Sequence, residues 1–444
     1  MKQILVVLLV FLQLSILSVR AEFIDMQKAG ANPTGTKLNT ELINTTINRL
    51  NANGGGTLFF PSGTYLTGAI KMKSNITLEL EAGATLLFSD NFEDYLPFVE
   101  MRHEGILMKS FCPLIYAVDA ENITIKGQGK LDGQGKKWWD EFFRVIIDVK
   151  DNGKRDINKY QVMWDNANDV KTLNAETNED YITSMKRRFF RPPFIQPVRC
   201  KNFLIEGVKI VNSPFWTINP EFCENVTVDG VTITNPLSPN TDGINPESCR
   251  YVHISNCHIS VGDDCITLKS GRDLQARNLN FPDENITITN CTMLAGHGGV
   301  VIGSEMSGGV KKVVISNCVF DGTDRGIRIK STRGRGGVVE DIQISNIVMK
   351  NIKEEAITMD MLYTRMPAEP KSERTPVFRN INISNMTADN VLIPIKIRGL
   401  EESPITDITF TNIHITAKQK CVFQNYKRIL MKDVFVNGEK ITLD

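Results

Sequence analysis

Apolar and polar residues alternate along most of the chain beyond about residue 200, and the alternation breaks repeatedly at Asn or Gly. Each copy reads apolar-x-apolar, then Asn or Gly, then apolar again, and copies follow one another at intervals of roughly 23 to 39 residues. A period of two predicts short β-strands, and a repeat of this length is typical of a solenoid. The copies begin at Phe203, Val226, Val252, Ile286, Val313, Ile342, Ile381 and Ile408.

A single copy has too little apolar surface to bury its own face, whereas stacked copies bury all of them in one column. We therefore predict an all-β chain folded as a single-stranded parallel β-helix. The recurrent Asn supports this, because Asn tolerates the left-handed backbone of a sharp turn and can hydrogen-bond to the Asn of the next coil. A β-sandwich of short strands is the alternative, but its turns have no reason to repeat one residue at one offset. The Asn positions are Asn256, Asn290, Asn317, Asn346, Asn385 and Asn412.

The N-terminal part supplies a cap and the first coils. Leu42, Ile43, Ile47 and Leu50 share one face of a predicted short helix, which would cover the open end of a solenoid. Strand and turn signals follow at residues 57–66, 76–86 and 123–127. Residues 136–191 break the pattern, because they are polar and contain Trp138, Trp139 and Trp164. We interpret this segment as a long insertion on one face.

A length of 444 residues allows two or three ordinary domains, but a continuous repeat favours one. We expect a signal peptide at residues 1–21 and a β-helix domain over 22–444, because an apolar run from Ile4 to Val19 follows Lys2 and Val19-Arg20-Ala21 resembles a cleavage site. The protein would then be secreted or periplasmic. An uncleaved membrane anchor is the alternative for this run.

The chain carries 51 basic and 51 acidic residues, so no global field indicates a nucleic acid or a membrane as partner. It also carries nine cysteines. Cys257, Cys291 and Cys318 occupy one position of the repeat, and we expect them to stack inward as small apolar residues. The cysteine count therefore supports no particular disulfide framework.

Polar residues align between neighbouring coils in a way that predicts a site. When Asn240-Thr-Asp-Gly is aligned with Gly262-Asp-Asp-Cys, Asp242 and Asp264 share a column, and Asp263 shares the adjacent column with His297. Adjacent rungs lie about 4.8 Å apart, so three carboxylates and an imidazole would meet. Neighbouring residues of a strand face opposite ways, so Asp263 and Asp264 both reach solvent only if Gly262 allows a bend.

Carboxylates this close should raise the pKa of at least one of them, which leaves a protonated acid beside ionised bases at mildly acidic pH. That pairing is what glycosidic bond cleavage requires. Asp-Asp and Asn-Thr-Asp-Gly taken singly are common turn residues. Their shared register with His297 favours a catalytic site.

Cations lie at related positions. Arg328 and Lys330 alternate with isoleucines, so both face one side of the strand, and Lys269 shares a column with Lys330. Such a cluster suits a substrate carboxylate, although ordinary surface cations are the alternative. Arg333 and Arg335 stand in a Gly-rich loop, and we expect them to be solvated.

Together these motifs resemble the polygalacturonase type of glycoside hydrolase family 28, which degrades pectin. Its four motifs occur intact and in order as Asn240-Thr241-Asp242, Gly262-Asp263-Asp264, Gly296-His297-Gly298 and Arg328-Ile329-Lys330. The resemblance extends from Gly54 through Val211–Trp216 to the last coils. It implies a right-handed β-helix that hydrolyses α-1,4-galacturonosyl linkages with inversion and without metal or other cofactor.

Carried over to this chain, the resemblance makes Asp263 the general acid, Asp242 and Asp264 the bases that activate water, and His297 their support. It makes Arg328 and Lys330 the ligands of a galacturonate carboxylate, and the column shared with Lys330 adds Lys269 to them. It also assigns a substrate contact to Tyr363, for which packing is an equal alternative.

We expect a monomer that acts on galacturonan and binds neither nucleic acid nor, after signal cleavage, a membrane. The insertion at 136–191 favours exo-action, because a long loop can wall off one end of the groove. Endo-action or a rhamnogalacturonan hydrolase remains possible within the family. Outside it, a calcium-dependent pectate lyase or a non-catalytic β-helix that binds carbohydrate would share the fold.

Overall fold

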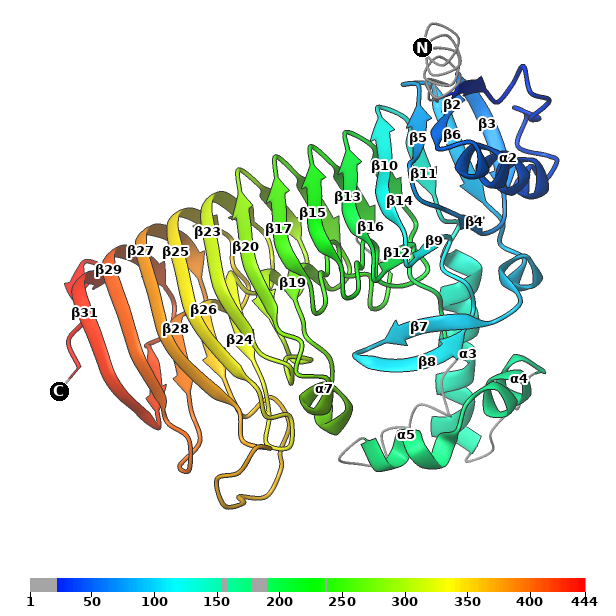
Figure 1. Ribbon diagram of the computed structural model, residues 1–444. Coiled ribbons are helices and arrows are strands. Elements are labelled where there is room, and N and C mark those ends of the chain that lie inside the picture. The colour runs from blue at the N-terminus through cyan, green and yellow to red at the C-terminus, as the bar shows by residue number, and fades with distance from the viewer. Residues whose placement is uncertain (1–21, 153–158, 177–189, 236–237, 444) are drawn as a thin grey trace, which may run out of the picture.

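The computed structural model describes residues 22–152, 159–176, 190–235 and 238–443. The chain winds as a parallel β-helix, as the repeat predicted, and its hand is right, as the resemblance implied; the coils stack from the N-terminal to the C-terminal end (Figure 1). The predicted signal peptide lies outside the described residues. Within them, no helix combines the length and the apolar character needed to cross a bilayer.

Each coil contributes strands to three faces. The first face begins with β1 (Glu22–Asp25), β2 (Gly56–Phe60), β5 (Ile76–Leu80), β10 (Glu121–Gly127), β13 (Lys201–Glu206), β15 (Glu224–Asp229), β17 (Arg250–Ser255) and β20 (Asp283–Thr289). The second begins with β3 (Gly63–Thr67), β6 (Ala84–Phe88), β11 (Lys130–Asp132), β14 (Lys209–Val211), β16 (Thr232–Asn235), β18 (His258–Val261) and β21 (Thr292–Ala295). In the later coils these two faces merge into the long strands β23 (Val310–Asp321), β25 (Val338–Lys350), β27 (Val377–Val391), β29 (Ile405–Ala417) and β31 (Tyr426–Val436), and β32 (Glu439–Lys440) closes the series antiparallel to β31.

The third face carries the site. It begins with β4 (Ile70–Lys71), β9 (Ile115–Val118) and β12 (Ile195–Val198) and ends with β19 (Asp264–Leu268), β22 (Gly298–Ile302), β24 (Ile327–Lys330), β26 (Glu355–Asp360), β28 (Ile393–Arg398) and β30 (Val422–Gln424). Between them, two coils join the face through isolated bridges such as Ile218 to Ile244 and Ile244 to Ile266. The register of this face therefore continues unbroken from β12 to β24.

One core fills the inside of the coils, because alternate residues of every face point inward. Cys257, Cys291 and Cys318 are buried in it as free thiols, as predicted. The Asn column also agrees with the prediction: each of its members has a positive φ. Its side chains form a ladder in which, for example, Asn412 Nδ2 donates to Asn385 Oδ1 at 2.9 Å. The ladder fixes the same sharp turn in successive coils.

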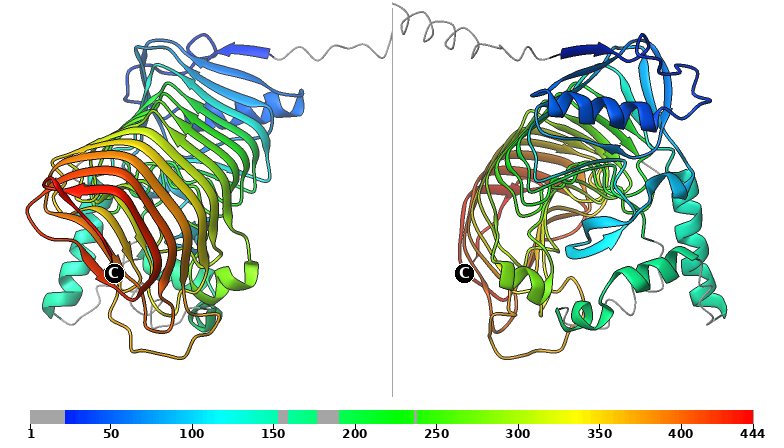
Figure 2. Two further views of the ribbon diagram at one scale, coloured as in Figure 1. Left: turned by 90° about the vertical axis from the view of Figure 1, so that its left-hand side faces the viewer. Right: turned by 45° about the vertical axis from the view of Figure 1, so that its right-hand side comes forward.

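The ends and one side carry the helices. Helix α2 (Thr40–Ala52) buries Ile43, Ile47 and Leu50 against the first coils, which confirms the predicted cap, and the right-hand view of Figure 2 shows it across the N-terminal end. Between β11 and β12 the chain forms α3 (Lys136–Asn152), α4 (Lys159–Ala167) and α5 (Val170–Glu176). Beside the third face lie η1 (Phe92–Tyr95), the hairpin of β7 (Val99–His103) and β8 (Ile106–Ser110), and α7 (Asp273–Leu279).

Candidate active site

The predicted alignment of the polar residues is correct. A bridge joins Ile244 to Ile266, which sets Asp242 in register with Asp264, and Asp264 pairs with Gly298 on the next coil. The chain bends at Gly262 and Asp263, between the end of β18 and the start of β19. A Cβ on Gly262 would lie 1.9 Å from the carbonyl oxygen of Ser238, so only glycine permits this bend.

The three carboxylates converge. One carboxylate oxygen from each of Asp242, Asp263 and Asp264 lies within 4.8 Å of the others, and all three side chains line one cavity. Only Asp263 reaches solvent to an appreciable extent, with 19% of its side chain exposed. Asp264 faces the cavity but is buried, because the cations of the later coils cover it. The bend thus turns both residues toward the cleft while it exposes only the first.

The predicted cations hold these carboxylates. Lys330 Nζ lies 2.7 Å from Asp264 Oδ2, and Arg328 Nη1 lies 3.4 Å from Asp264 Oδ1. Lys269 Nζ lies 3.6 Å from Asp242 Oδ2. All three cations are at least nine-tenths buried, so they are not ordinary surface residues.

The surroundings shift the pKa values of two of the carboxyl groups in opposite directions. Burial, together with the charge of Asp263, raises the pKa of Asp242 well above its usual range. Burial also acts to raise the pKa of Asp264, but Lys330, Arg328 and Lys269 outweigh it and hold this pKa below its usual value. The expected raised pKa therefore falls on Asp242, and Asp264 stays ionised.

His297 stands beside the exposed carboxylate. Its Nδ1 lies 3.1 Å from Asp263 Oδ1, as the shared column predicted, and its Nε2 lies 3.9 Å from Asp324 Oδ2. The contact with Asp263 raises the pKa of His297, with burial opposing. The imidazole is half exposed and can exchange its proton with solvent.

Aromatic rings lie over the cations. The Tyr363 ring centroid is 5.3 Å from Lys330 Nζ and 5.6 Å from Arg328 Cζ, and Tyr363 is 46% exposed. Tyr363 therefore lies at the site, and much of its side chain is open to solvent. Trp216, which the sequence placed only in a family motif, lies with its ring 4.5 Å from Lys269 Nζ.

The expectation for Arg333 and Arg335 is wrong. Arg335 is 6% exposed, and its Nη1 lies 2.7 Å from Asp273 Oδ1. Arg333 pairs with Glu402. The Gly-rich loop is covered by other loops that a composition argument does not reveal. Arg335 also lines the cleft, so the sequence analysis missed a cation of the site.

Three carboxylates at this spacing could also ligate a divalent cation. Lys330 and Arg328 already neutralise Asp264, and Lys269 already approaches Asp242. Positive charge is thus supplied by the chain, which makes a donor set of this kind a poor fit for calcium.

Comparisons with known proteins agree with this geometry. The family model for glycosyl hydrolases family 28 matches residues 180–432. The chain belongs to this family. This family 28 chain is 35% identical to a hyperthermoactive exopolygalacturonase of Thermotoga maritima, with a TM-score of 0.83, over 95% of this chain and 93% of that one.

Two curated relatives of the family 28 chain agree with this assignment to the family. A probable polygalacturonase of Vitis vinifera is 29% identical over 424 residues, which are 93% of this chain and 78% of that protein. An exo-poly-α-D-galacturonosidase of Dickeya chrysanthemi is 25% identical over 473 residues, which are 94% of this chain and 75% of that protein. The chain is a glycoside hydrolase.

The cleft of this family 28 enzyme is a cavity of about 290 Å³. Its lining also includes Glu104, Arg272 and Glu305, which the sequence analysis did not select, and Asn240, which it named only as part of a motif. Lys269 Nζ lies 3.0 Å from Glu305 Oε2. Glu104, Arg272 and Glu305 come from loops and from the hairpin, where no repeat signals them.

The hairpin of β7 and β8 closes one side of the cleft, where Glu104 of its turn lines the cavity. Arg102 of β7 is 1% exposed, and its Nη1 lies 3.5 Å from Glu221 Oε2 and its Nε 3.6 Å from Glu247 Oε1. The His103 ring stacks on Phe215, with centroids 4.4 Å apart. The hairpin is thereby held against the coil that carries Asp242 and against the coil before it.

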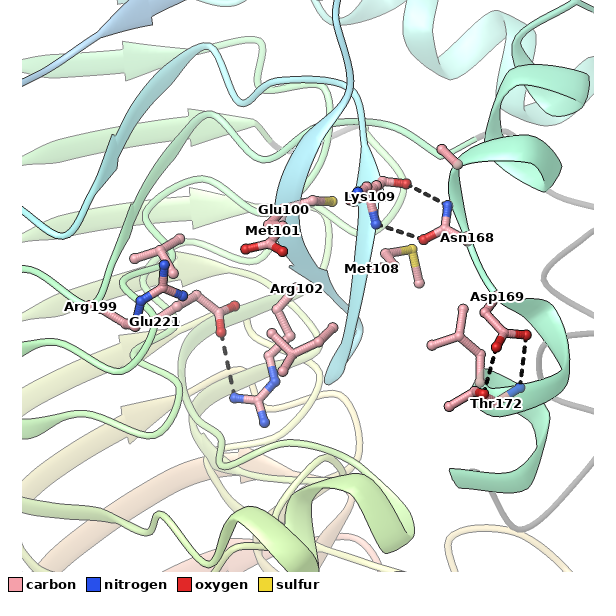
Figure 3. Close-up of a pocket in the computed structure, with 14 residues that line it drawn as sticks. Glu100, Met101, Arg102, Met108, Lys109, Asn168, Asp169, Thr172, Arg199 and Glu221 are labelled. Carbon is pink, nitrogen blue, oxygen red and sulfur yellow. Dashed lines mark hydrogen bonds and ion pairs between the residues drawn. The ribbon is translucent and has the colours of Figure 1, made fainter.

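The insertion braces this hairpin from behind. Asn168, which follows α4, accepts a hydrogen bond from the Lys109 N–H at 2.7 Å and donates one to the Lys109 carbonyl oxygen at 2.9 Å (Figure 3). A small apolar cluster joins the two elements, made of Met101, Ile106, Met108, Trp164, Leu173 and Phe190. Arg191, at the end of the insertion, donates to Asn240 Oδ1 at the rim of the cleft, 2.8 Å away.

Proposed function

We propose that this enzyme is an exo-polygalacturonase, which cleaves α-1,4-galacturonosyl linkages of polygalacturonate with inversion. One observation carries the proposal: three carboxylates meet three buried cations in a cleft that the hairpin closes on one side. The carboxylates suit glycoside hydrolysis, the cations suit an anionic sugar, and the closed side suits attack at a chain end. Both the Thermotoga maritima and the Dickeya chrysanthemi relatives carry exo-acting names.

Asp263 serves as the general acid in this proposal. It is the most exposed of the three carboxylates and the one in contact with His297, so it can take up a proton from solvent through the imidazole. Asp242 and Asp264 hold the attacking water between them and remove its proton. Lys330 and Arg328 keep Asp264 ionised for that role.

The substrate carboxylate binds to Arg328, Lys330 and Lys269. Arg328 donates one N–H group to Asp264 at 3.4 Å, and other donors of its guanidinium group can bind a substrate carboxylate. Tyr363 supplies an exposed ring over both cations, on which a sugar face can stack. An esterified sugar lacks this charge and would bind weakly.

Export to the periplasm or the cell exterior fits a polymeric substrate, and we infer it together with action as a monomer. The apolar run at residues 4–19 supports export. The free cysteines do not oppose it, because eight of the nine are buried in the described structure.

A time course of product sizes from polygalacturonate, with a chelator present, tests the function. Reducing ends and the ultraviolet absorbance of unsaturated sugars are followed together. Saturated monomer from the outset is the expected result. Mixed saturated oligomers would make the enzyme endo-acting, and unsaturated product that appears only on adding calcium would make it a lyase. Activity on rhamnogalacturonan alone would change the substrate.

A further inference from the structure

The tip of the β7–β8 hairpin has an unusual residue for its turn. His103 pairs with Ile106, which leaves Glu104 and Gly105 as a two-residue loop. Both have positive φ, 45° and 87°, as in a type I′ turn. Such turns favour Asn-Gly or Asp-Gly, because short polar side chains tolerate the left-handed region and longer ones do so poorly. A Glu held in this conformation is a local strain of the kind that gathers at functional sites.

The turn rests inside the cleft. Arg272 N–H donates to the Gly105 carbonyl at 3.1 Å. A Cβ on Gly105 would lie 2.9 Å from Arg272 Cβ and 3.0 Å from Glu305 Cγ, so the tip is packed closely against the cleft wall. The neighbouring Glu104 lines the same cavity as Asp263 and Lys269. A carboxylate is thus placed at the side of the cleft that the hairpin closes.

Glu104 has the opposite charge to the groups that bind the polymer. Galacturonate presents a carboxylate on every sugar, and the cleft meets it with Lys269, Arg328 and Lys330. A carboxylate accepts hydrogen bonds from hydroxyl groups and repels another carboxylate. A terminal sugar offers free hydroxyl groups where an internal sugar continues into the next uronate.

We propose that Glu104 is a specificity-determining residue that recognises the end of the polygalacturonate chain. It accepts hydrogen bonds from the hydroxyl groups of the terminal galacturonate and repels a further uronate. This inference rests on the proposed exo-action and adds the group that would select the end. The hairpin supplies the steric wall, and Glu104 supplies the chemical discrimination.

Two variants at this position test the proposal. Asn and Asp have nearly the same shape, and both are favoured in this turn, so E104N and E104D differ chiefly in charge. The substrates are trigalacturonate, the trimer with an unsaturated non-reducing sugar, and the trimer with its reducing end reduced to the alditol. The readout is the ratio of kcat/KM between the unmodified trimer and each modified one, which does not depend on the amount of folded enzyme.

The natural enzyme should reject one of the modified trimers, and E104D should largely keep that ratio. In E104N the kcat/KM for the unmodified trimer should fall about 10- to 100-fold, the range for a lost hydrogen bond to a charged group, and the ratio should move toward one. The Tm of E104N should not fall below that of the natural enzyme.

Three results would overturn the assignment: a natural enzyme that accepts both modified trimers equally, an unchanged ratio in E104N, or an equal loss in E104D and E104N. None of them touches the proposed function, since polygalacturonate would still yield monomer. Mixed oligomers from the natural enzyme at the outset would instead refute exo-action itself.

Discussion

Replacing Arg102 by Met should loosen the β7–β8 hairpin and leave the coils intact. The guanidinium of Arg102 lies among the wholly buried carboxylates of Glu221 and Glu247 and donates to Gly105 O and Ser248 Oγ, each at 3.2 Å. Met keeps much of the aliphatic volume. The change therefore removes charge and hydrogen bonds rather than packing.

Removing one partner from a buried ion pair costs about 3–5 kcal/mol. The lower end applies here, because burial, with the charge of Glu247, already raises the pKa of Glu221 well above its usual range, so Glu221 can stay neutral. Within the described residues, β7 and β8 pair only with each other, so the cost falls on opening of the hairpin. About 3 kcal/mol corresponds to a roughly 100-fold larger opening equilibrium.

The cost should also depend on pH. An acid whose pKa is higher in the folded state than in the unfolded state binds more protons when folded, so its stability contribution falls as pH rises through the folded pKa. Without Arg102, Glu221 loses the cation whose charge favours its ionised form. The difference between R102M and the natural enzyme should therefore widen from mildly acidic to alkaline pH.

Hydrogen exchange followed by mass spectrometry measures this opening. Peptides over residues 99–110 should exchange about 100-fold faster in R102M, while peptides from α2 should not change. The matched control is R428M, which removes a solvent-exposed pair with Asp407, because exposed pairs of this kind contribute little to stability. R102M should also release oligomers from polygalacturonate. Unchanged exchange in the hairpin, or an equal rise in α2, would refute the reasoning.

Four further outcomes are expected at the active site. D263N should lower kcat by about 10²–10⁴-fold, the usual contribution of a general acid, and leave the Tm unchanged. The control D407N, on the outer face, should leave kcat unchanged. Full activity in D263N would show that Asp263 is not the general acid. The raised pKa of Asp242 should place the acid limb of kcat/KM above the usual range for Asp, because the base is lost as pH falls through that pKa, and D242N should abolish hydrolysis. The raised pKa of His297 should place an alkaline limb above about 6.5, and a limb that H297Q leaves in place would belong to another group. Proton NMR of the first product should show the β-anomer, as inversion requires. The test is demanding, because the oxygens of the three carboxylates lie closer together than the about 6.5–9.5 Å usual between the carboxyl groups of inverting enzymes. An α-anomer would instead indicate that one of these carboxylates is a nucleophile.

The sequence by itself determined the coils and the columns on them. A period of two with Asn at one offset specifies stacked parallel strands, because a one-residue slip would turn every apolar side chain outward. Once the register was set, Asp242 had to meet Asp264, and Asp263 had to meet His297. The catalytic cluster was therefore predictable from an alignment of the chain with itself.

Only the tertiary structure decided how the cleft is closed and which loop residues line it. Arg102 meets Glu221 across 119 positions of sequence, and Arg335 meets Asp273 across 62, neither at a repeat spacing. The pattern of the chain accordingly did not indicate the hairpin at the cleft, and it predicted a solvated Arg335 where the structure buries this side chain. A repeat dictates contacts between equivalent positions of neighbouring coils, whereas a hairpin or a loop that folds back is positioned by packing and charge that no local pattern encodes.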